Sequence, residues 1–215
     1  MFLLTILSIF LAGCNETSVN NDNNDEPYAE NLIKIKNEYD DGSMVILSDN
    51  EQTYSGWIHS TGDVPAVCGL ASSGGGDNLT SRIVFRFDLS SWNGEKLSFH
   101  AKCIDVYGDP GQIELYLIND TGSIPINQEN LTNISQYWLL KNNGIKISTV
   151  NGSKNKWIQI PLPSESIQKK ISKDAMLSIL LKIVDESRNL NEDFYLFSTY
   201  ENTPNDSSDI AYLKK

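Results

Sequence analysis

The sequence is short of the residues on which several functional classes depend. Its 215 residues include 17 Lys and Arg against 28 Asp and Glu, for a net charge of −11, and only Arg82, Arg86 and Arg188 are arginines. Nucleic acids and anionic membrane surfaces reward clustered basic residues, so this balance argues against both as partners. Two histidines and three cysteines leave little material for a zinc site or a His-based catalytic triad. The length is sufficient for one large domain with its own core.

An apolar run at the N-terminus has the features of an export signal. Residues 2–13 carry no charge. A run of this length is too short to span a bilayer, which takes about 20 residues, but it matches the core of a signal peptide. Residues 11–14 read Leu-Ala-Gly-Cys, which resembles the lipobox of bacterial lipoproteins and makes Cys14 the expected lipid attachment site. The positively charged region that usually begins a signal peptide is missing, because the first Lys or Arg is Lys34. The alternative is a buried apolar strand with a chance cysteine.

A segment rich in Asn and Asp follows the apolar run. Residues 15–30 contain no Lys or Arg and only two sizeable apolar side chains, Val19 and Tyr28. Such a segment buries too little apolar surface to offset the entropy lost on ordering. We therefore expect residues 15–39 to form a disordered tether, and residues 40–215 to form the folded domain.

From residue 40 onward, runs of β-forming residues alternate with turn sequences such as Asn93-Gly94 and Asn143-Gly144. Many closely spaced short strands favour an all-β, jelly-roll-like antiparallel β-sandwich of about ten strands over βαβ units. One short helix is expected at residues 164–172, where Ser164 can cap the N-terminus. The predicted strands are 43–48, 63–71, 82–89, 97–107, 112–118, 144–149, 156–160, 176–184, 193–200 and 209–213.

Alternation within the predicted strands assigns their faces. In the run 82–89, the residues at odd positions are all apolar, whereas Arg82 and Arg86 lie at even positions. Because successive side chains in a strand point to opposite faces, the odd positions should form the core. The opposite face should mix charged and aromatic side chains.

The segment Ser81–Ser90 (SRIVFRFDLS) resembles the DNRLRE-type domain, a group that overlaps carbohydrate-binding module family 96. That group has an arginine-containing strand ending in Phe-Asp-Leu-Ser. The similarity covers about residues 40 to 215, and it implies a jelly-roll sandwich with a carbohydrate-binding role on a secreted or surface protein. The further matches, in order, are Ser91–Gly94, His100–Cys103, Trp138, Trp157–Ile160 and Phe197–Glu201.

The mixed face supplies the first candidate ligand site. Arg82 and Arg86 lie four residues apart, and Tyr116 and Lys182 are expected to face the same way from other strands. Guanidinium groups bind vicinal hydroxyls or carboxylates in a bidentate manner, and the ring of Tyr116 could stack on a pyranose. The alternative is a ladder of cross-strand ion pairs that also contains Glu114. In either case Glu201 is a possible partner of an arginine.

A loop-rich stretch supplies the second candidate. Tyr54, Trp57 and His59 form an aromatic cluster between residues 51 and 62. Loop aromatics at the rim of a sandwich can form a platform on which the CH groups of a sugar pack. The alternative is a loop that its own tryptophan fixes onto the sheet.

Two further possibilities concern cross-links and metals. Cys68 and Cys103 remain once Cys14 is lipidated, and in an exported protein they could form a disulfide or stay as two buried thiols. Asp40 and Asp41 precede the first strand and Asp209 lies near the last. They could contribute to a structural calcium site, but calcium needs six to eight oxygen ligands, and three scattered carboxylates are more typical of solvated turns. We expect no other cofactor.

The leading hypothesis is a surface-tethered, non-catalytic lipoprotein that binds polysaccharide. Its partners would be a glycan and, through the lipid anchor only, a membrane. The acidic balance favours a neutral polysaccharide over a strongly anionic one. A structural or adhesive envelope module that binds protein is the alternative. A polysaccharide-active enzyme is less favoured because the sequence contains no recognisable catalytic motif.

Overall fold

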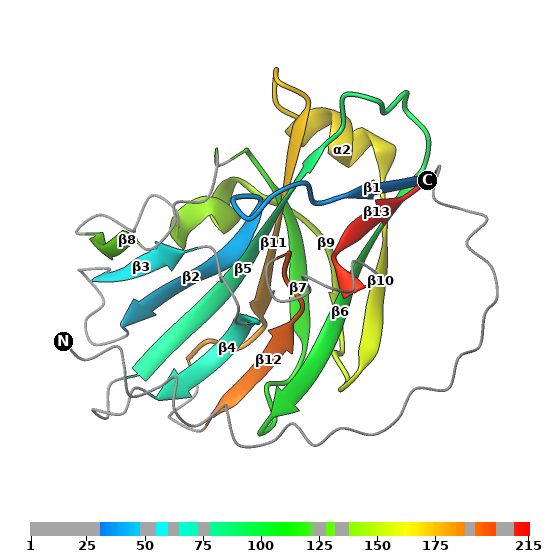
Figure 1. The fold of residues 1–215 in the computed structure, drawn as a ribbon. Coiled ribbons are helices and arrows are strands. Elements are labelled where there is room, and N and C mark those ends of the chain that lie inside the picture. Colours follow the sequence, from blue (N-terminus) through cyan, green and yellow to red (C-terminus); the bar gives the residue numbers. More distant parts are fainter. Residues whose placement is uncertain are drawn as a thin grey trace.

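Antiparallel strands make up most of the computed structural model, which describes residues 31–47, 55–59, 65–72, 78–120, 122, 128–131, 138–187, 192–200 and 209–215. These residues form an all-β sandwich with one α-helix, which confirms the predicted fold class (Figure 1). The strands are β1 (Leu32–Lys34), β2 (Asp41–Leu47), β3 (Ser55–His59), β4 (Ala66–Ser72), β5 (Asn78–Asp88), β6 (Leu97–Tyr107), β7 (Ile113–Ile118), β8 (Gln128–Leu131), β9 (Ile145–Val150), β10 (Lys156–Leu162), β11 (Met176–Ile183), β12 (Asp193–Phe197) and β13 (Tyr212–Lys214). The helices are the 3₁₀-helix η3 (Leu139–Asn143) and α2 (Ser164–Lys170).

The strands form two layers that continue into one another. The β5 sheet runs in the order β8-β3-β2-β5-β11-β7-β9, and the β6 sheet contains β4, β12, β6 and β10 with β13 and β1 beside them. Strand β5 pairs with β2 along one edge, and along its other edge with β4 first and then with β11. The sandwich is therefore continuous at the β4–β5 pairing, where the two layers meet.

The core lies between the two layers, and the predicted alternation holds. Ile83, Phe85 and Phe87 of β5 are fully buried, and the facing β6 sheet contributes Phe99. The Phe99 ring lies 5.5 Å from that of Phe85 and 6.1 Å from that of Phe87, measured between ring centroids. Tilted and edge-on aromatic contacts of this kind add specific stabilisation to the burial of apolar area. Phe99 thus joins the two layers at the centre of the core.

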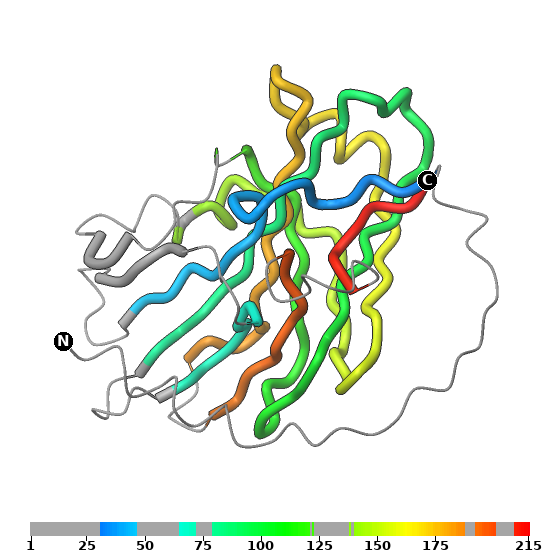
Figure 2. Tube along the Cα trace, in the orientation of Figure 1, coloured from blue at the N-terminus to red at the C-terminus, as the bar shows by residue number. Residues whose placement is uncertain are grey.

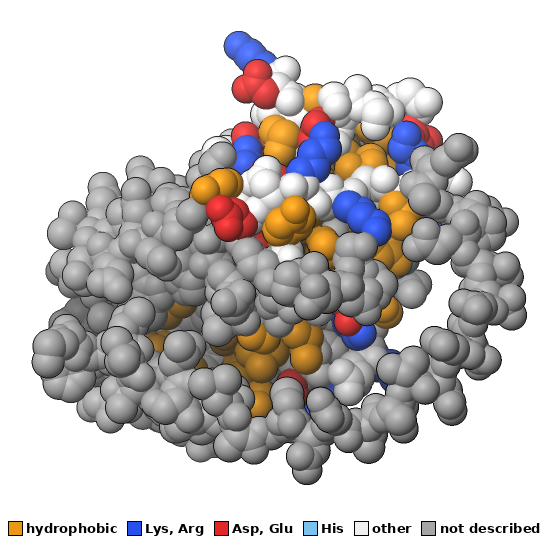
Figure 3. Space-filling view, viewed as in Figure 1, with side chains coloured by type: hydrophobic (Ala, Val, Ile, Leu, Met, Phe, Trp, Pro, Cys, Tyr) orange, Lys and Arg blue, Asp and Glu red, His pale blue; other side chains and the backbone are white. Residues whose placement is uncertain are grey.

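The first and last described strands pair beside β6. Strand β1 pairs with β13, and β13 pairs in turn with β6. Figure 2 shows the blue strand β1 beside the red strand β13, and on the face seen in Figure 3 hydrophobic side chains and basic side chains lie next to each other. The fold therefore begins by Leu32, within the segment 15–39 that was expected to be a tether. Ile33 and Ile35 explain the difference, because both are buried in the core.

Other local predictions meet mixed outcomes. The helix α2 falls within the predicted range, but Pro163 occupies the N-cap position and Ser164 makes no side-chain cap. Two further strands differ from the prediction. Strand β3 lies in the stretch 51–62, which the sequence pattern predicts to be loop-rich, and β8 lies between the predicted strands 112–118 and 144–149. None of the helices in the described residues is long and apolar enough to cross a membrane.

The two cysteines of the domain do not form a disulfide. Both are buried free thiols, Cys68 in β4 and Cys103 in β6. Strand β12 lies between them, with Tyr195 opposite Cys68 and Phe197 opposite Cys103. Two inter-strand spacings separate their backbones by about 10 Å. A disulfide needs Cα atoms within about 7 Å, so of the two sequence-based alternatives the structure has the buried thiols.

We expect these thiols to be inert in the folded protein. Burial raises the pKa of both thiols, that of Cys103 to about 11, and only the thiolate reacts. In a Cys14→Ser variant, a thiol-reactive chromophore at about pH 8 should label nothing in native buffer and both cysteines after unfolding in denaturant. An unfolded, unreduced protein that shows no reactive thiol would contradict this expectation.

Candidate functional site

The outward face of the β5 sheet holds the first set of predicted site residues. Arg82 and Arg86 project from β5, Tyr116 from β7 and Lys182 from β11. These positions agree with the predicted alternation, but the face is covered rather than open. Arg82 is 1% exposed, Lys182 4% and Arg86 7%. An apolar cluster made of Met44, Ile46, Val84, Ile118, Trp138 and Leu180 lies on the same face.

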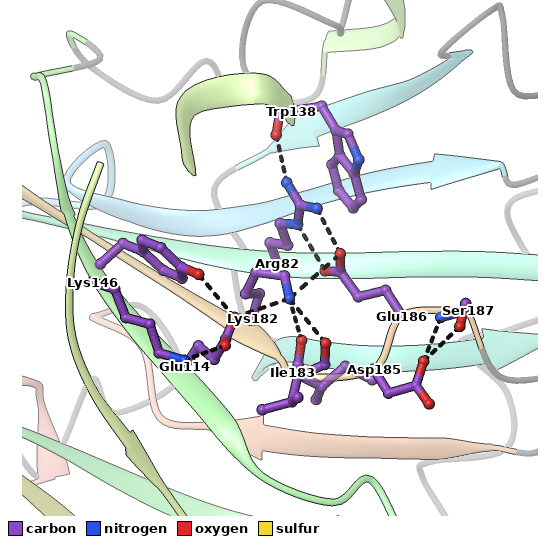
Figure 4. A network of polar contacts seen from close by, with 11 residues as sticks. Arg82, Glu114, Trp138, Lys146, Lys182, Ile183, Asp185, Glu186 and Ser187 are labelled. Atoms are coloured by element: carbon purple, nitrogen blue, oxygen red, sulfur yellow. Dashed lines mark hydrogen bonds and ion pairs between the residues drawn. The ribbon is translucent and has the colours of Figure 1, made fainter. Parts of the chain in front are cut away.

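Arg82 uses its guanidinium group entirely within the fold (Figure 4). Its Nε and Nη2 donate to the two carboxylate oxygens of Glu186 at 2.7 and 2.6 Å, and Nη1 donates to the carbonyl oxygen of Trp138. The guanidinium carbon also lies 3.6 Å from the centroid of the Trp138 ring. A bidentate ion pair, a carbonyl contact and a cation–π contact together satisfy the buried charge. Arg82 therefore holds Trp138 and the segment after β11, which contains Glu186, against the sheet.

Lys182 and Glu114 form a second buried pair on neighbouring strands. Lys182 Nζ lies 3.3 Å from Glu114 Oε2 and donates to the carbonyl of Ile183 at 2.5 Å. Glu114 also accepts from Lys146 at 2.6 Å and from the Tyr116 hydroxyl at 2.9 Å. Burial opposes ionisation of Glu114, but these hydrogen bonds and the Lys182 charge hold its pKa below the ordinary value. Burial and the bond to Glu114 raise the pKa of Tyr116 to about 12.

Arg86 is held by two carboxylates. Its Nη1 donates to Asp40 and its Nε to Asp120, each at 2.9 Å. The Ser178 hydroxyl donates to the same Asp120 oxygen at 3.1 Å. Burial raises the pKa of Asp40, although the neighbouring charge of Arg86 opposes that shift. Together with the pairs above, this arrangement is the ion-pair ladder foreseen as the alternative to an open sugar site.

The other predicted site residues lie wholly or partly outside the residues that the structure describes. Cys14, Tyr54 and Glu201 lie outside the described residues, and for Trp57 and His59 only the backbone of β3 is described. Among the described residues, the carboxylate partners of Arg82 and Arg86 are Glu186, Asp40 and Asp120.

The three carboxylates considered for calcium have other partners. Asp40 binds Arg86, Asp41 accepts the backbone N–H of Tyr200 at 2.9 Å, and Asp209 forms an ion pair with Lys102. Across the part of the chain that the structure describes, no group of three or more His, Cys, Asp or Glu side chains could hold a metal ion.

The outward face of the β6 sheet carries a second, aromatic arrangement. Three rings from three strands meet there: Trp157 of β10, His100 of β6 and Tyr212 of β13. The His100 and Tyr212 rings are stacked, with centroids 4.6 Å apart and planes 11° from parallel. The Trp157 ring lies 5.3 Å from that of Tyr212 at a tilt of 56°. Trp157 and Tyr212 are half-buried, so part of each ring faces solvent. We call these three residues the aromatic face.

Polar side chains surround the aromatic face. In register with His100 lie Gln159 on β10 and, beyond Tyr212, Lys34 on β1, and both are exposed. Ser98 shares a hydrogen bond of 2.8 Å with Nε2 of His100, and Lys102 forms its ion pair with Asp209 beside the rings. Hydrogen-bonding groups around partly exposed rings are the usual equipment of a site for a polar ligand with apolar faces.

His100 is the one member of the aromatic face that is almost completely covered. It is 6% exposed, and its Nδ1 atom is buried with no hydrogen-bond partner among the described residues. Burial lowers the pKa of His100, and the charge of Lys214 lowers it further. The imidazole is therefore neutral at pH 7.

The sequence contains a signal for this face in the alternation of β10 and β13. In β10, Ile158, Ile160 and Leu162 are buried, so Trp157 and Gln159 must point outward. The same alternation puts Tyr212 outward beside the buried Ala211 and Leu213. What the sequence alone could not supply was the register that brings these strands together.

Chemically, the aromatic face can accept a ring-shaped ligand with CH groups on its faces and hydroxyls at its edge. The partly exposed rings offer stacking surfaces, and Gln159, Lys34 and Lys102 offer hydrogen bonds. In comparisons with known proteins, no family model matches this chain and no curated protein matches its sequence.

Proposed function

We propose that the protein is a non-catalytic carbohydrate-binding lipoprotein, held at the cell surface through Cys14, and that the aromatic face is its glycan site. One observation carries the proposal: Trp157 and Tyr212 present partly exposed rings 5.3 Å apart on an outward sheet face that is edged by hydrogen-bonding side chains. A pyranose has apolar CH faces and a hydroxyl rim, which is the complementary arrangement. The short motifs that resemble the DNRLRE-type domain support the same function.

The aromatic face is a better glycan site than the ion-pair ladder on the β5 sheet. Ligand hydroxyls could reach Arg82 only by displacing Glu186 and Trp138, which would leave buried charge without a partner. Breaking one buried ion pair costs about 3–5 kcal/mol, which would offset most or all of what two hydroxyls gain on a charged group, at about 1.5–3 kcal/mol each. Trp157 and Tyr212 need no such rearrangement, because part of each ring already faces solvent.

The overall charge of −11 does not describe the surroundings of the aromatic face. Three basic residues flank it, Lys34, Lys102 and Lys214. The acidic residue described beside them is Asp209, which is paired with Lys102. Local charge, more than net charge, governs which ligands approach a given surface. The glycans tested should therefore include neutral and acidic polysaccharides in equal number.

A glycan array tests the proposal with the full chain made soluble by Cys14→Ser. We expect at least one glycan to bind, and Trp157→Ala and Tyr212→Ala each to weaken its affinity at least about fivefold, since lost ring stacking costs about 1 kcal/mol or more. Tyr39→Ala is the matched control, because Tyr39 is a 39% exposed aromatic residue that precedes β2, a strand of the β5 sheet. A blank array, or binding that both variants retain, would refute the proposal. Unchanged membrane association of Cys14→Ser would refute the lipid anchor.

A further inference from the structure

The terminal strands are attached to the fold by their pairing with β6 and by buried side chains such as Ile33 and Leu213. Among the described strands β1 pairs only with β13, over three residue pairs, and β13 pairs with β6 over another three. Three side-chain contacts reinforce the β13–β6 pairing. They are the His100–Tyr212 ring stack, the Lys102–Asp209 ion pair and the contact of the Ser98 hydroxyl with the Lys214 carbonyl at 3.5 Å. Anything that breaks the ring stack weakens the attachment of both terminal strands.

The environment of His100 is suited to a neutral imidazole only. Nε2 shares its hydrogen bond with the Ser98 hydroxyl, and the ring is covered by Tyr212. Nδ1 is buried without a partner among the described residues. In the neutral form Nδ1 can remain an unprotonated acceptor, whereas protonation would place an N–H there with nothing to accept it. A buried donor without an acceptor is costly, and a charged one more so.

The charges facing His100 also oppose its protonation. Lys34 comes from β1, Lys102 from β6 itself and Lys214 from β13, and all three are cations. Asp209 is the acid described on this face, and it is bound to Lys102. Strand β10 contributes Trp157 and Gln159, which do not titrate. A protonated imidazole would be attracted to the Tyr212 ring, but that attraction gives Nδ1 no acceptor.

We propose that His100 is an acid-sensitive latch: while neutral it holds Tyr212, and with it β13 and β1, against β6, and when protonated it weakens this attachment so that both strands open more often. Because the pKa of His100 is lower in the folded protein than the ordinary value of about 6.5, the contribution of the latch is fully present above that value. It is lost as pH falls through the folded-state pKa. The consequence for ligands rests on the proposed function: once Tyr212 leaves, the aromatic face is dismantled and a bound glycan is released in acid.

Hydrogen exchange tests the latch without any ligand. Amide protection in the Cys14→Ser chain should be compared between about pH 7 and pH 5, which bracket the ordinary pKa of histidine, after correction for intrinsic exchange. We expect protection in β13 and β1 to fall by up to about tenfold for each pH unit between the ordinary histidine pKa of about 6.5 and the lower folded-state pKa of His100, and to level off below it. The β12–β6 pairing is the internal reference, and its protection should not change.

His100→Gln is the informative variant, because glutamine is neutral and can hydrogen-bond to Ser98. We expect its terminal strands to keep constant protection across the same pH range. If His100→Gln already loosens these strands at neutral pH, NMR titration of the wild type replaces this comparison. The latch then requires the contact between the His100 and Tyr212 rings to weaken as His100 is protonated. Wild-type protection that does not change with pH, or that falls equally in His100→Gln, overturns the latch.

Glycan affinity provides a separate arm. If the array yields a ligand, its affinity for the wild type should fall with the same pH dependence, and its affinity for His100→Gln should not. If the array is blank, the proposed function fails while the exchange experiment still decides the latch. If a glycan binds equally at both pH values although the terminal strands loosen, the latch stands and its control of the ligand is refuted.

Discussion

Replacing Arg82 by methionine is expected to lower the free energy of unfolding by about 3–5 kcal/mol, the usual cost of removing one partner from a buried ion pair. Methionine keeps most of the aliphatic volume, so the loss reports mainly on the guanidinium group. Without it, the carboxylate of Glu186, whose side chain is 15% exposed, loses both short hydrogen bonds and retains Lys182 at 3.8 Å. The Trp138 carbonyl also loses its donor. Equilibrium unfolding in denaturant measures the difference.

Lys146→Ala is the matched control for Arg82→Met. Lys146 forms an ion pair of 2.6 Å with Glu114 on the same face, but its side chain is 48% exposed. Exposed pairs contribute about 0–1 kcal/mol because water competes for both charges. The double variant Arg82→Met with Glu186→Gln should recover part of the loss, since it removes the uncompensated carboxylate. Equal losses in Arg82→Met and Lys146→Ala would mean that the burial of Arg82 is energetically unimportant.

Arg82 also illustrates what sequence patterns can and cannot predict. Alternation in the run 82–89 correctly separated Arg82 and Arg86 from the core positions, because side-chain direction in a strand is a local property. The cover over that face is not local. Glu186 is 104 residues from Arg82 in the sequence, and Trp138 is 56 residues away. A pattern within one strand therefore identifies an outward face but gives no information about whether something lies over it.

The aromatic face was missed for the same physical reason. Its three rings come from β6, β10 and β13, and each ring shows only that its own position points outward. The contact between them depends on the register that sets Tyr212 and Gln159 on either side of His100. The choice between a disulfide and two free thiols is also decided at this level, since β12 lies between the strands of the two cysteines. Strand order and register are set by long-range packing, which short motifs do not encode.

Phe99→Ala should cost about 3–5 kcal/mol, comparable to Arg82→Met but for a different physical reason. Phe99 is fully buried between the layers, and its ring meets those of Phe85 and Phe87. The substitution removes the transfer free energy of the ring and leaves a cavity. Both flanking rings belong to β5, which is fixed by β2 on one edge and by β4 and β11 on the other, so the site can collapse only partly.

Two comparisons show whether the loss at Phe99 arises from the cavity. Phe99→Leu fills part of the space and should lose clearly less than Phe99→Ala, because the cost rises with the volume left empty. Val184→Ala removes apolar atoms from a side chain that is 46% exposed and should change stability by no more than about 0.5 kcal/mol. Denaturant unfolding of all three variants gives the ranking. If Phe99→Leu and Phe99→Ala were equally destabilising, the aromatic contacts with Phe85 and Phe87 would outweigh the cavity. If neither differed from Val184→Ala, the two layers would not be joined through this ring.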